Sequence, residues 1–376
     1  MFDILLSVAI AFTITFLAIP VIIFVAEGKK LYDVPDARKI HNAPIPSLGG
    51  LGIFAGFILS CLVMIPLGHA PEFQFFFAAA FVIFFLGLKD DILDISPIKK
   101  FIGQVLAAFL IIYKGGVQIQ SMHGFLGLQE LPPMFSLLFT YLTVIVIINS
   151  FNLIDGIDGL AGTLGLMASF AFGIYFSAVE MVPYAILSFA LAGSLAAFLI
   201  FNFQPARIFM GDTGSLLLGL LHSILVIKFI TVAGTPGGAT HLDAAPAIGF
   251  SVLLIPLLDT VRVFSIRISH RRSPFSPDRN HIHHLLLDRG LSHSTITLVL
   301  VSANLLFMVA TYALRSLGCT WLIIGLFALF FTGIGILYYT RRRPRLFVAK
   351  TVKTNGVETP ASKIVPLTKD AVLEQK

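Results

Sequence analysis

The amino-acid sequence predicts an all-α, polytopic membrane protein with about eleven transmembrane helices. Hydrophobic residues make up 57% of the 376-residue chain and charged residues only 12%, about half of the charged fraction that is typical of a soluble domain. Apolar runs close to the ~20 residues that a helix needs to cross a bilayer recur along the whole chain. Eleven such runs lie near residues 3–25, 48–67, 73–88, 98–113, 133–150, 157–178, 182–201, 211–232, 246–266, 295–314 and 320–340.

These runs predict one transmembrane catalytic domain over residues 1–345. The tail over residues 346–376 is polar and lacks helical apolar periodicity, so we expect it to be disordered in the cytoplasm.

The basic residues predict the orientation of the chain. No Lys or Arg precedes the first apolar run, whereas Lys29 and Lys30 follow it, so the run is expected to be a membrane helix with the N-terminus outside. With eleven spans the loops alternate, and 23 of the 26 Lys and Arg residues then fall on the cytoplasmic side together with the C-terminus. The net charge of +6 therefore indicates membrane orientation, and no nucleic-acid partner is expected.

Polar residues gather in five clusters, all on the predicted cytoplasmic side. In chain order the clusters hold Arg38, Lys39 and His41; Asp90, Asp91 and Asp94; Asn149, Asn152, Asp155 and Asp158; Asn202, Arg207 and Asp212; and Asp278, Arg279, His281, His283 and His284. Each cluster alone is compatible with an ordinary solvated loop. Their coincidence on one face favours a shared functional site.

The mixture of charges in these clusters indicates the chemistry of that site. Carboxylates repel anions and basic side chains attract them, so a site with both suggests an anionic substrate bridged to acids by a hard cation. Mg²⁺ is usually held by one or two carboxylates together with substrate phosphates. Gly211-Asp212-Thr213-Gly214, at the mouth of a span, offers such a carboxylate. The sequence thus predicts phosphate chemistry at the cytoplasmic membrane surface.

Five motifs, in this order, carry a resemblance to a known family. "RKIHNAPIPSLGG", "DDILD", "NSFNLIDGIDGLAG", "FMGDTGS" and "SPFSPDRNHIHHLL" resemble the ordered motifs of the polyprenyl-phosphate N-acetylhexosamine-1-phosphate transferases, which are classed as glycosyltransferase family 4. The match runs from about Asp33 to His293 and looks closest to the bacterial undecaprenyl-phosphate N-acetylglucosaminyl-1-phosphate transferases. Ile282 interrupts the histidines, which argues against the branch that uses a MurNAc-pentapeptide donor.

The resemblance implies the reaction and its partners. The enzyme would sit in the bacterial plasma membrane among membrane lipids, with its active site on the cytoplasmic face. It would transfer N-acetylglucosamine-1-phosphate, or a related N-acetylhexosamine-1-phosphate, from a UDP-N-acetylhexosamine to undecaprenyl phosphate and release UMP. This is the first membrane step of cell-envelope glycan synthesis. Mg²⁺ or Mn²⁺ would be the cofactor, and a homodimer is the assembly to test.

The resemblance also implies roles for the residues that match its motifs. The metal would be held by Asp212, with Asn152 as co-ligand. The catalytic residues would be Asp90, Asp91, Asp155, His281 and Lys39. The substrate-binding residues would be Asn149, Asn202, Arg279, His283 and His284. Whether Asp90 or Asp91 acts as a base or only positions and neutralises charge stays open.

Two other functional classes are weighed against this interpretation. An ion- or proton-coupled transporter would also hold intramembrane acids, but near the bilayer midplane and between repeated halves. An intramembrane aspartyl protease would need two catalytic aspartates, one usually in Gly-x-Gly-Asp. The chain has Phe209-Met210-Gly211-Asp212, which lacks the first glycine.

Overall fold

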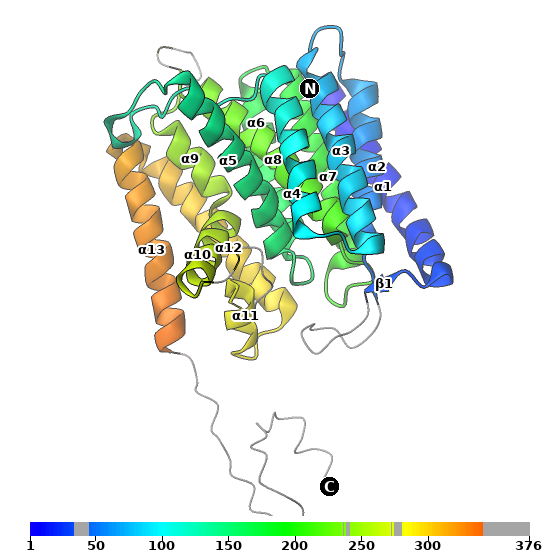
Figure 1. Ribbon diagram of the computed structural model, residues 1–376. Coiled ribbons are helices and arrows are strands. Elements are labelled where there is room, and N and C mark those ends of the chain that lie inside the picture. Colours follow the sequence, from blue (N-terminus) through cyan, green and yellow to red (C-terminus); the bar gives the residue numbers. More distant parts are fainter. Residues whose placement is uncertain (34–44, 236, 238–240, 272, 274–279, 341–376) are drawn as a thin grey trace, which may run out of the picture.

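The computed structural model describes residues 1–33, 45–235, 237, 241–271, 273 and 280–340 as a bundle of helices (Figure 1). The α-helices are α1 (Phe2–Lys29), α2 (Gly49–Met64), α3 (Glu72–Leu93), α4 (Pro97–Phe109), α5 (Pro133–Ile154), α6 (Leu160–Ala178), α7 (Val182–Asn202), α8 (Gly211–Ala233), α9 (Ala245–Val252), α10 (Leu254–Ser269), α11 (Ile282–Leu287), α12 (His293–Ala313) and α13 (Cys319–Tyr339). Short helical turns are η1 (Leu110–Lys114), η2 (Phe125–Gly127) and η3 (Arg315–Leu317). Strands β1 (Tyr32–Asp33) and β2 (Ile45–Pro46) pair antiparallel. The predicted all-α class is confirmed.

A multi-pass membrane protein is confirmed as well. Within the described residues, seven helices are long and apolar enough to cross a membrane, or eight if the bent pair α9 and α10 forms one span. Each of the eleven predicted runs coincides with a helix or with that pair. α2 is apolar but shorter, and α3 and α4 are not among the seven, so the count of eleven stays a prediction. The predicted tail, residues 346–376, lies outside the described residues.

Helices α7 and α8 form the centre of the bundle. Their most apolar windows are 83% and 78% buried, whereas those of α1 and α13 are only 22% buried. α8 packs against α2, α3, α5 and α6, so its N-terminus lies where several helices end. The peripheral helices present apolar side chains outward, as expected for surfaces that contact lipid tails.

The predicted continuous span over residues 246–266 is wrong in one respect. The structure divides it at Leu253 into two helices that meet at 80°. The cause is Pro256, which has no N–H and whose ring would clash with the carbonyl of Val252 in a continuous helix. In the structure Pro256 lies in the first turn of α10, where a proline is tolerated.

Asn304 of α12 satisfies the backbone groups that this break leaves without helical partners. Its Oδ1 accepts a hydrogen bond from the Ile255 amide (3.0 Å), and its Nδ2 donates to the carbonyls of Val252 (3.1 Å) and Ser251 (3.3 Å). Asn304 is fully buried. The bend is therefore a stabilised part of the fold, and it turns α10 toward the end of α5, against which it packs.

The described polar clusters lie at one end of the bundle. In Figure 1 the hairpin strand β1, the α3–α4 turn, the α5–α6 turn and helix α11 lie at its lower end, opposite the N-terminus. The fold thus brings segments that are far apart in the sequence to one face.

Candidate active site

Glycines allow helix α3 to approach the start of α8 closely. A Cβ atom on Gly87 would lie 2.5 Å from the Cα of Thr213, closer than real Cβ contacts allow. Gly211 has a φ of +70°, and a Cβ there would lie 2.1 Å from the Ser47 carbonyl oxygen. Side chains at these two positions would separate α3 from α8. Their absence lets the acidic end of α3 reach the N-terminus of α8.

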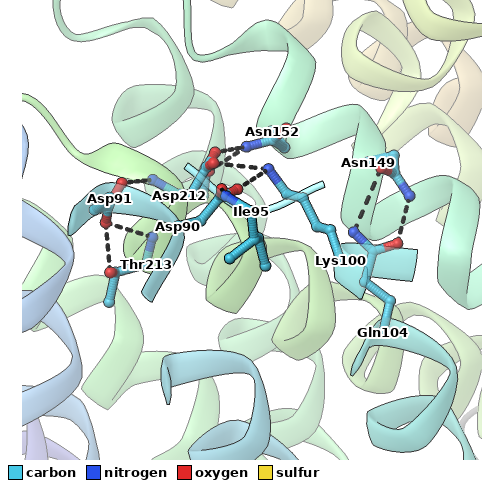
Figure 2. A network of polar contacts seen from close by, with 10 residues as sticks. Asp90, Asp91, Ile95, Lys100, Gln104, Asn149, Asn152, Asp212 and Thr213 are labelled. Atoms are coloured by element: carbon cyan, nitrogen blue, oxygen red, sulfur yellow. Dashed lines mark hydrogen bonds and ion pairs between the residues drawn. The ribbon is translucent and has the colours of Figure 1, made fainter. Parts of the chain in front are cut away.

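Asp91 caps the N-terminus of α8. Its Oδ1 accepts from the backbone amide of Asp212 (2.7 Å), and its Oδ2 accepts from the amide (3.0 Å) and the hydroxyl (2.5 Å) of Thr213 (Figure 2). A carboxylate at a helix N-terminus pairs with free amides and with the positive end of the helix dipole. Both oxygens of Asp91 are therefore engaged in joining α3 to α8.

Asp90 and Asp212 share one ammonium group. Lys100 Nζ lies 2.9 Å from Asp90 Oδ2 and 2.7 Å from Asp212 Oδ2 (Figure 2). The other oxygen of Asp90 accepts from the Ile95 amide at 2.8 Å. Pro97 at the start of α4 fits the first helical turn, and this turn places Lys100 one helical turn further along. Two carboxylates from distant helices thus converge on a single positive charge.

This convergence fits a hard divalent cation. Oxygen atoms of Asp90 and Asp212 already surround a cationic centre, and Mg²⁺ commonly takes one or two carboxylates and completes its shell with water and phosphate. Across the described ranges no set of three His, Cys, Asp or Glu side chains converges as a metal site. An all-protein cage is therefore not formed by these residues, and substrate oxygens would supply the remaining ligands.

Asn152, the predicted co-ligand, lies beside Asp212. Its Nδ2 makes a close contact with Asp212 Oδ1 (Figure 2). The same Nδ2 donates to Ser215 Oγ at 3.0 Å. The amide nitrogen, not the oxygen, faces the carboxylate in this arrangement. Ligation of a metal by Asn152 would require the amide to turn over.

A small polar pocket adjoins the ion pair. It has a volume of about 160 Å³ and includes Asp90, Lys100, Gln104 and Asn149 in its lining. Asn149 Nδ2 donates to Gln104 Oε1 at 2.9 Å, so α5 and α4 are joined at this level (Figure 2). The predicted substrate-binding residue Asn149 thus lines the pocket with its amide held in place.

Asp155 follows the last residue of α5 and lies near the other acids. Enclosure by the protein raises the pKa of Asp155 well above its usual value, and the carboxylates of Asp212, Asp91 and Asp158 raise it further. A nearby cation or hydrogen-bond donor would favour the ionised form of such a carboxyl group. A bound ligand that brings either one near Asp155 would therefore change its protonation.

Asp259 organises the histidine segment. It lies on α10, is 1% exposed, and its Oδ2 accepts from His281 Nδ1 at 2.8 Å. Its Oδ1 accepts from the Ile282 amide (3.0 Å) and from Arg262 Nη2 (2.8 Å). The start of α11 is thereby fixed to α10.

His283 connects the histidine segment to the α5–α6 turn. Its ring lies against Gly156, where an added Cβ would be 2.6 Å from Nε2, and it stacks on His281 with the ring centroids 5.5 Å apart. His283 is buried, and its Nδ1 has no hydrogen-bond partner among the described residues. Burial, and then the neighbouring rings of His284 and His281, lower the pKa of His283 well below its usual value. The ring is therefore neutral, and Gly156 places it next to Asp155.

Asn202 ties two turns of the site together. Its Oδ1 accepts from the Gly159 amide (2.9 Å) and its Nδ2 donates to the Ile208 carbonyl (2.8 Å). These bonds join the α5–α6 turn to the segment that leads into α8. The geometry is consistent with a shaping role for this predicted substrate-binding residue.

Lys39 and Arg279 lie outside the described residues. The flank that follows Lys39 is held at the site, because Phe209 N donates to the Pro46 carbonyl (2.8 Å) and Gly49 N donates to the Phe209 carbonyl (2.9 Å). Asn280, next to Arg279, accepts from Arg262 through its carbonyl. The described residues that flank these two basic segments, Pro46 and Asn280, are thus bound to Phe209 and Arg262.

Three site residues were not singled out for chemistry in the sequence: Lys100, Gln104 and Asp259. Lys100 is one of the basic residues that indicate the orientation, and Ser96-Pro97 predicts a helix start that would direct Lys100 back toward the acids. Asp259 and Arg262 stand three positions apart inside an apolar run, which is the signal of a paired intramembrane charge. Gln104 carried no such signal.

The sequence comparisons agree with this geometry. Residues 73–230 match the model of the family described as "Glycosyl transferase family 4". That range contains Asp90, Asp91, Lys100, Asn152 and Asp212, which are the residues that form the acidic centre.

Curated relatives are similar over most of the chain. An undecaprenyl-phosphate alpha-N-acetylglucosaminyl 1-phosphate transferase of Yersinia pestis is 31% identical over 331 residues, which is 86% of this chain and 87% of the relative. The protein of the same description in Haemophilus influenzae is 34% identical and covers 77% and 80% of the two chains. A decaprenyl-phosphate N-acetylglucosaminephosphotransferase of Mycobacterium tuberculosis is 32% identical and covers 71% of each.

Proposed function

Because this chain belongs to glycosyl transferase family 4, we propose that it is a phosphoglycosyl transferase of bacterial membranes. It transfers N-acetylglucosamine-1-phosphate, or a related N-acetylhexosamine-1-phosphate, from a UDP-sugar to undecaprenyl phosphate and releases UMP. The observation that carries the proposal is the convergence of Asp90, Lys100 and Asp212 at one end of a membrane bundle. The relatives are described as transferases that act on undecaprenyl or decaprenyl phosphate, so the transporter and protease alternatives are not retained.

The reaction is an in-line displacement at phosphorus. A phosphate oxygen of the acceptor forms a bond to the β-phosphorus of the UDP-sugar, and the bond from that phosphorus to the bridging oxygen breaks. UMP leaves with the bridging oxygen and its electron pair. The acceptor, a phosphomonoester with a second pKa of about 6, is mostly a dianion at neutral pH and needs little help from a base. Catalysis is therefore mainly neutralisation and positioning of anions.

A divalent cation, Mg²⁺ or Mn²⁺, would neutralise phosphate charge and polarise the phosphorus–oxygen bonds when bound. Asp90 and Asp212 would hold it. Lys100 supplies a second positive charge at the same point and pairs with the acceptor phosphate. Asp91 positions Asp212 through the α8 cap, so in our proposal Asp90, not Asp91, faces the acceptor.

The acceptor's chain has an apolar path to this point. A pocket of about 400 Å³ lies between α5, α8, α9, α10 and α13 and is lined almost entirely by apolar side chains. Along α5, Phe139, Leu142 and Val146 line this pocket, and Asn149 and Leu153 line the polar one. Because residues three or four positions apart share a helix face, one face of α5 runs from the apolar pocket to the polar pocket.

Helix α10, which packs against α5, shows the same transition. Leu257 and Val261 line the apolar pocket, and Phe264 lines the polar one. The bend at Leu253 gives α10 this course. We assign the apolar pocket to part of the polyprenyl chain and the polar pocket to its phosphate.

The donor occupies the other side of the acids. Asp155 begins the α5–α6 turn, and the neutral ring of His283 lies against Gly156 of that turn and stacks on His281. Asn202 fixes the turn through the Gly159 amide. Lys39, Arg279 and His284 add charge or hydrogen bonds for the donor's two phosphates. The donor sugar and Mg²⁺ versus Mn²⁺ are to be settled by assay with a panel of UDP-sugars and metals.

The orientation also belongs to this proposal: the N-terminus outside, and the active site and C-terminus in the cytoplasm. A cysteine at Gln129, which is exposed before α5, should react with an impermeant thiol reagent on intact cells lacking native cysteines. A cysteine at Lys99, exposed in α4, should react only after lysis. Labelling of the Lys99 variant on intact cells would overturn the cytoplasmic site. The homodimer stays a prediction, to be checked by the mass of the purified protein.

The activity is tested on purified protein with undecaprenyl phosphate and radiolabelled UDP-N-acetylhexosamines. The proposal expects a lipid-soluble labelled product with at least one N-acetylhexosamine donor, and none without the acceptor. Absence of product with every donor in the presence of Mg²⁺ and Mn²⁺ would contradict it.

A further inference from the structure

We propose that Asp259 is a positioning residue for the transfer, an inference that rests on the proposed function. Asp259 holds the His281 ring so that Nδ1 is used within the protein and Nε2 is the nitrogen left for the donor's phosphates. Asp259 acts through His281 and does not itself touch substrate.

Both carboxylate oxygens of Asp259 accept hydrogen bonds from other residues. Oδ2 accepts from His281 Nδ1 at 2.8 Å, and Oδ1 accepts from Ile282 N at 3.0 Å and from Arg262 Nη2 at 2.8 Å. The side chain is 1% exposed. A buried carboxylate is costly unless it is paired and hydrogen-bonded. Three donors, two of them on side chains that can carry charge, meet that requirement here.

Arg262 fixes this carboxylate from the other side. Besides Asp259 it donates to the Asn280 carbonyl, and its Nη1 donates to the Tyr338 hydroxyl at 3.3 Å. Arg289, after α11, donates to Thr340 Oγ1 at 2.6 Å. Arg262 of α10 thus links Tyr338 of α13 to Asn280 at the start of the histidine segment, and Arg289 links the end of that segment to Thr340, which follows α13. His281 is thus bound to α10 through Asp259.

The hydrogen bond to Asp259 determines which ring nitrogen is available. In either protonation state of His281, Nδ1 carries a proton that it donates to the carboxylate, because an ionised carboxylate can only accept. Nε2 is then the nitrogen for a ligand, and it donates to a phosphate oxygen when it also carries a proton. A partner on one ring nitrogen commonly fixes both the tautomer and the ring orientation.

The substitution Asp259→Asn should invert this arrangement. The position of Oδ1 faces two donors, Ile282 N and Arg262, so the amide oxygen of asparagine is favoured there. The amide NH₂ then faces His281 Nδ1 and donates to it. The neutral His281 ring is then expected to carry its proton on Nε2. Asparagine has nearly the same size and shape as aspartate, so the change is confined to the hydrogen bond.

The tautomer is measured directly by ¹⁵N NMR of histidine-labelled protein in lipid, without any assay of activity. The His281→Gln variant identifies the His281 signals by their loss. We expect a protonated Nδ1 in the wild type and a proton-free Nδ1 in Asp259→Asn at a pH where the ring is neutral. An unchanged His281 spectrum in Asp259→Asn would overturn the proposal.

The kinetic consequence is a loss of about 10- to 100-fold in kcat for Asp259→Asn, the usual effect of removing a partner that orients a histidine. The KM for undecaprenyl phosphate should stay within about twofold, because the acceptor binds beside Asp90. In a His281→Gln background, Asp259→Asn should cause no further loss, since the two residues act as one unit. Asp259→Glu, which keeps the acceptor, should recover part of the rate.

A matched control replaces the carboxylate of Asp243, which is 65% exposed at the other end of the bundle. Asp243→Asn should keep the wild-type kcat and the wild-type His281 spectrum. Wild-type kcat in folded Asp259→Asn, or independent losses in the double variant, would show a merely structural carboxylate and overturn the inference. An inactive wild-type protein would instead refute the proposed function, and the NMR measurement would still decide the Asp259–His281 arrangement.

Discussion

Lys100 Nζ lies 2.7 Å from Asp212 Oδ2, although 112 positions separate the two residues in the sequence. The same ammonium contacts Asp90, so α3, α4 and α8 meet at one charge. Two ionised carboxylates this close to one ammonium group would repel each other if the ammonium were absent. The positive charge of Lys100 therefore stabilises the acidic centre.

Lys100→Met should lower kcat by on the order of 10², the effect of removing one preorganised charge or donor from a reacting centre. The physical reason is that the two carboxylates lose their shared partner and the acceptor phosphate loses a positive charge. Steady-state assays with each substrate varied separately measure it. Lys99→Met is the control, because Lys99 is exposed one position earlier and should give wild-type rates. Equal rates in both variants would remove Lys100 from the active site.

Chelation by EDTA should abolish turnover, and Mg²⁺ or Mn²⁺ should restore it. Asp212→Asn should lose nearly all activity at any metal concentration while inserting normally into the membrane, because one of two converging carboxylates is neutralised. Activity across a metal titration, with membrane insertion checked by immunoblot, measures both. Substantial turnover in the presence of chelator would refute the bridging cation.

Gly87→Ala should destabilise the protein by about 1–3 kcal/mol, the usual cost of overpacking. Its methyl group would meet backbone atoms of Thr213 and Asp212, the nearest at 2.5 Å. Thermal unfolding in detergent measures the effect. Gly333→Ala is the control: nothing lies within 4 Å of its new methyl group, and alanine favours a helix over glycine. A melting temperature of Gly87→Ala equal to that of Gly333→Ala would contradict the close approach of α3 to α8.

The order of apolar runs was enough to predict the all-helical membrane class, and the polar clusters between them were enough to predict one shared face. Both follow from local composition, since a run of ~20 apolar residues has few alternatives to a membrane helix. The bend at Leu253 was missed, because its stability depends on Asn304, which lies on another helix. Pro256 is visible in the sequence of the span itself, but Asn304, which bonds to the backbone groups at the bend, lies about 50 residues further along the chain.

The proximity of Asp90, Asn152 and Asp212 could be predicted from the sequence. The involvement of Lys100, Gln104 and Asp259, and the pairing of the acids, could not. Asp90 and Asp91 are adjacent in sequence, yet one faces Lys100 and the other caps α8. Consecutive residues on a helix point about 100° apart, and only the packing of α3 on α8 decides which faces which partner. For the same reason the role of Asp259 could not be predicted, because His281 is brought to it by tertiary structure.

His283 should make the protein less stable as the pH falls below about 6.5. Its pKa is lowered by burial in the folded protein, whereas in the unfolded chain it is near 6.5. Below that value the unfolded state binds a proton that the folded state does not, so stability falls with decreasing pH, by up to about 1.4 kcal/mol for each pH unit.

Thermal unfolding between pH 7.5 and 5.5 measures this dependence. His283→Gln should show a shallower decline than the wild type, and His270→Gln, at an exposed position, should keep the wild-type slope. The same slope in wild type and His283→Gln would contradict a buried neutral ring.

The fate of the donor's β-phosphate distinguishes transfer of a sugar-1-phosphate from transfer of the sugar alone. Purified protein is incubated with undecaprenyl phosphate, Mg²⁺ and UDP-N-acetylglucosamine that carries ³²P only in the β-phosphate, with Asp212→Asn as the inactive control. We expect ³²P to move into the lipid fraction together with the sugar, and one unlabelled UMP to appear for each sugar transferred. Sugar in the lipid fraction with ³²P left in water-soluble UDP would show transfer of the sugar alone and would contradict the account.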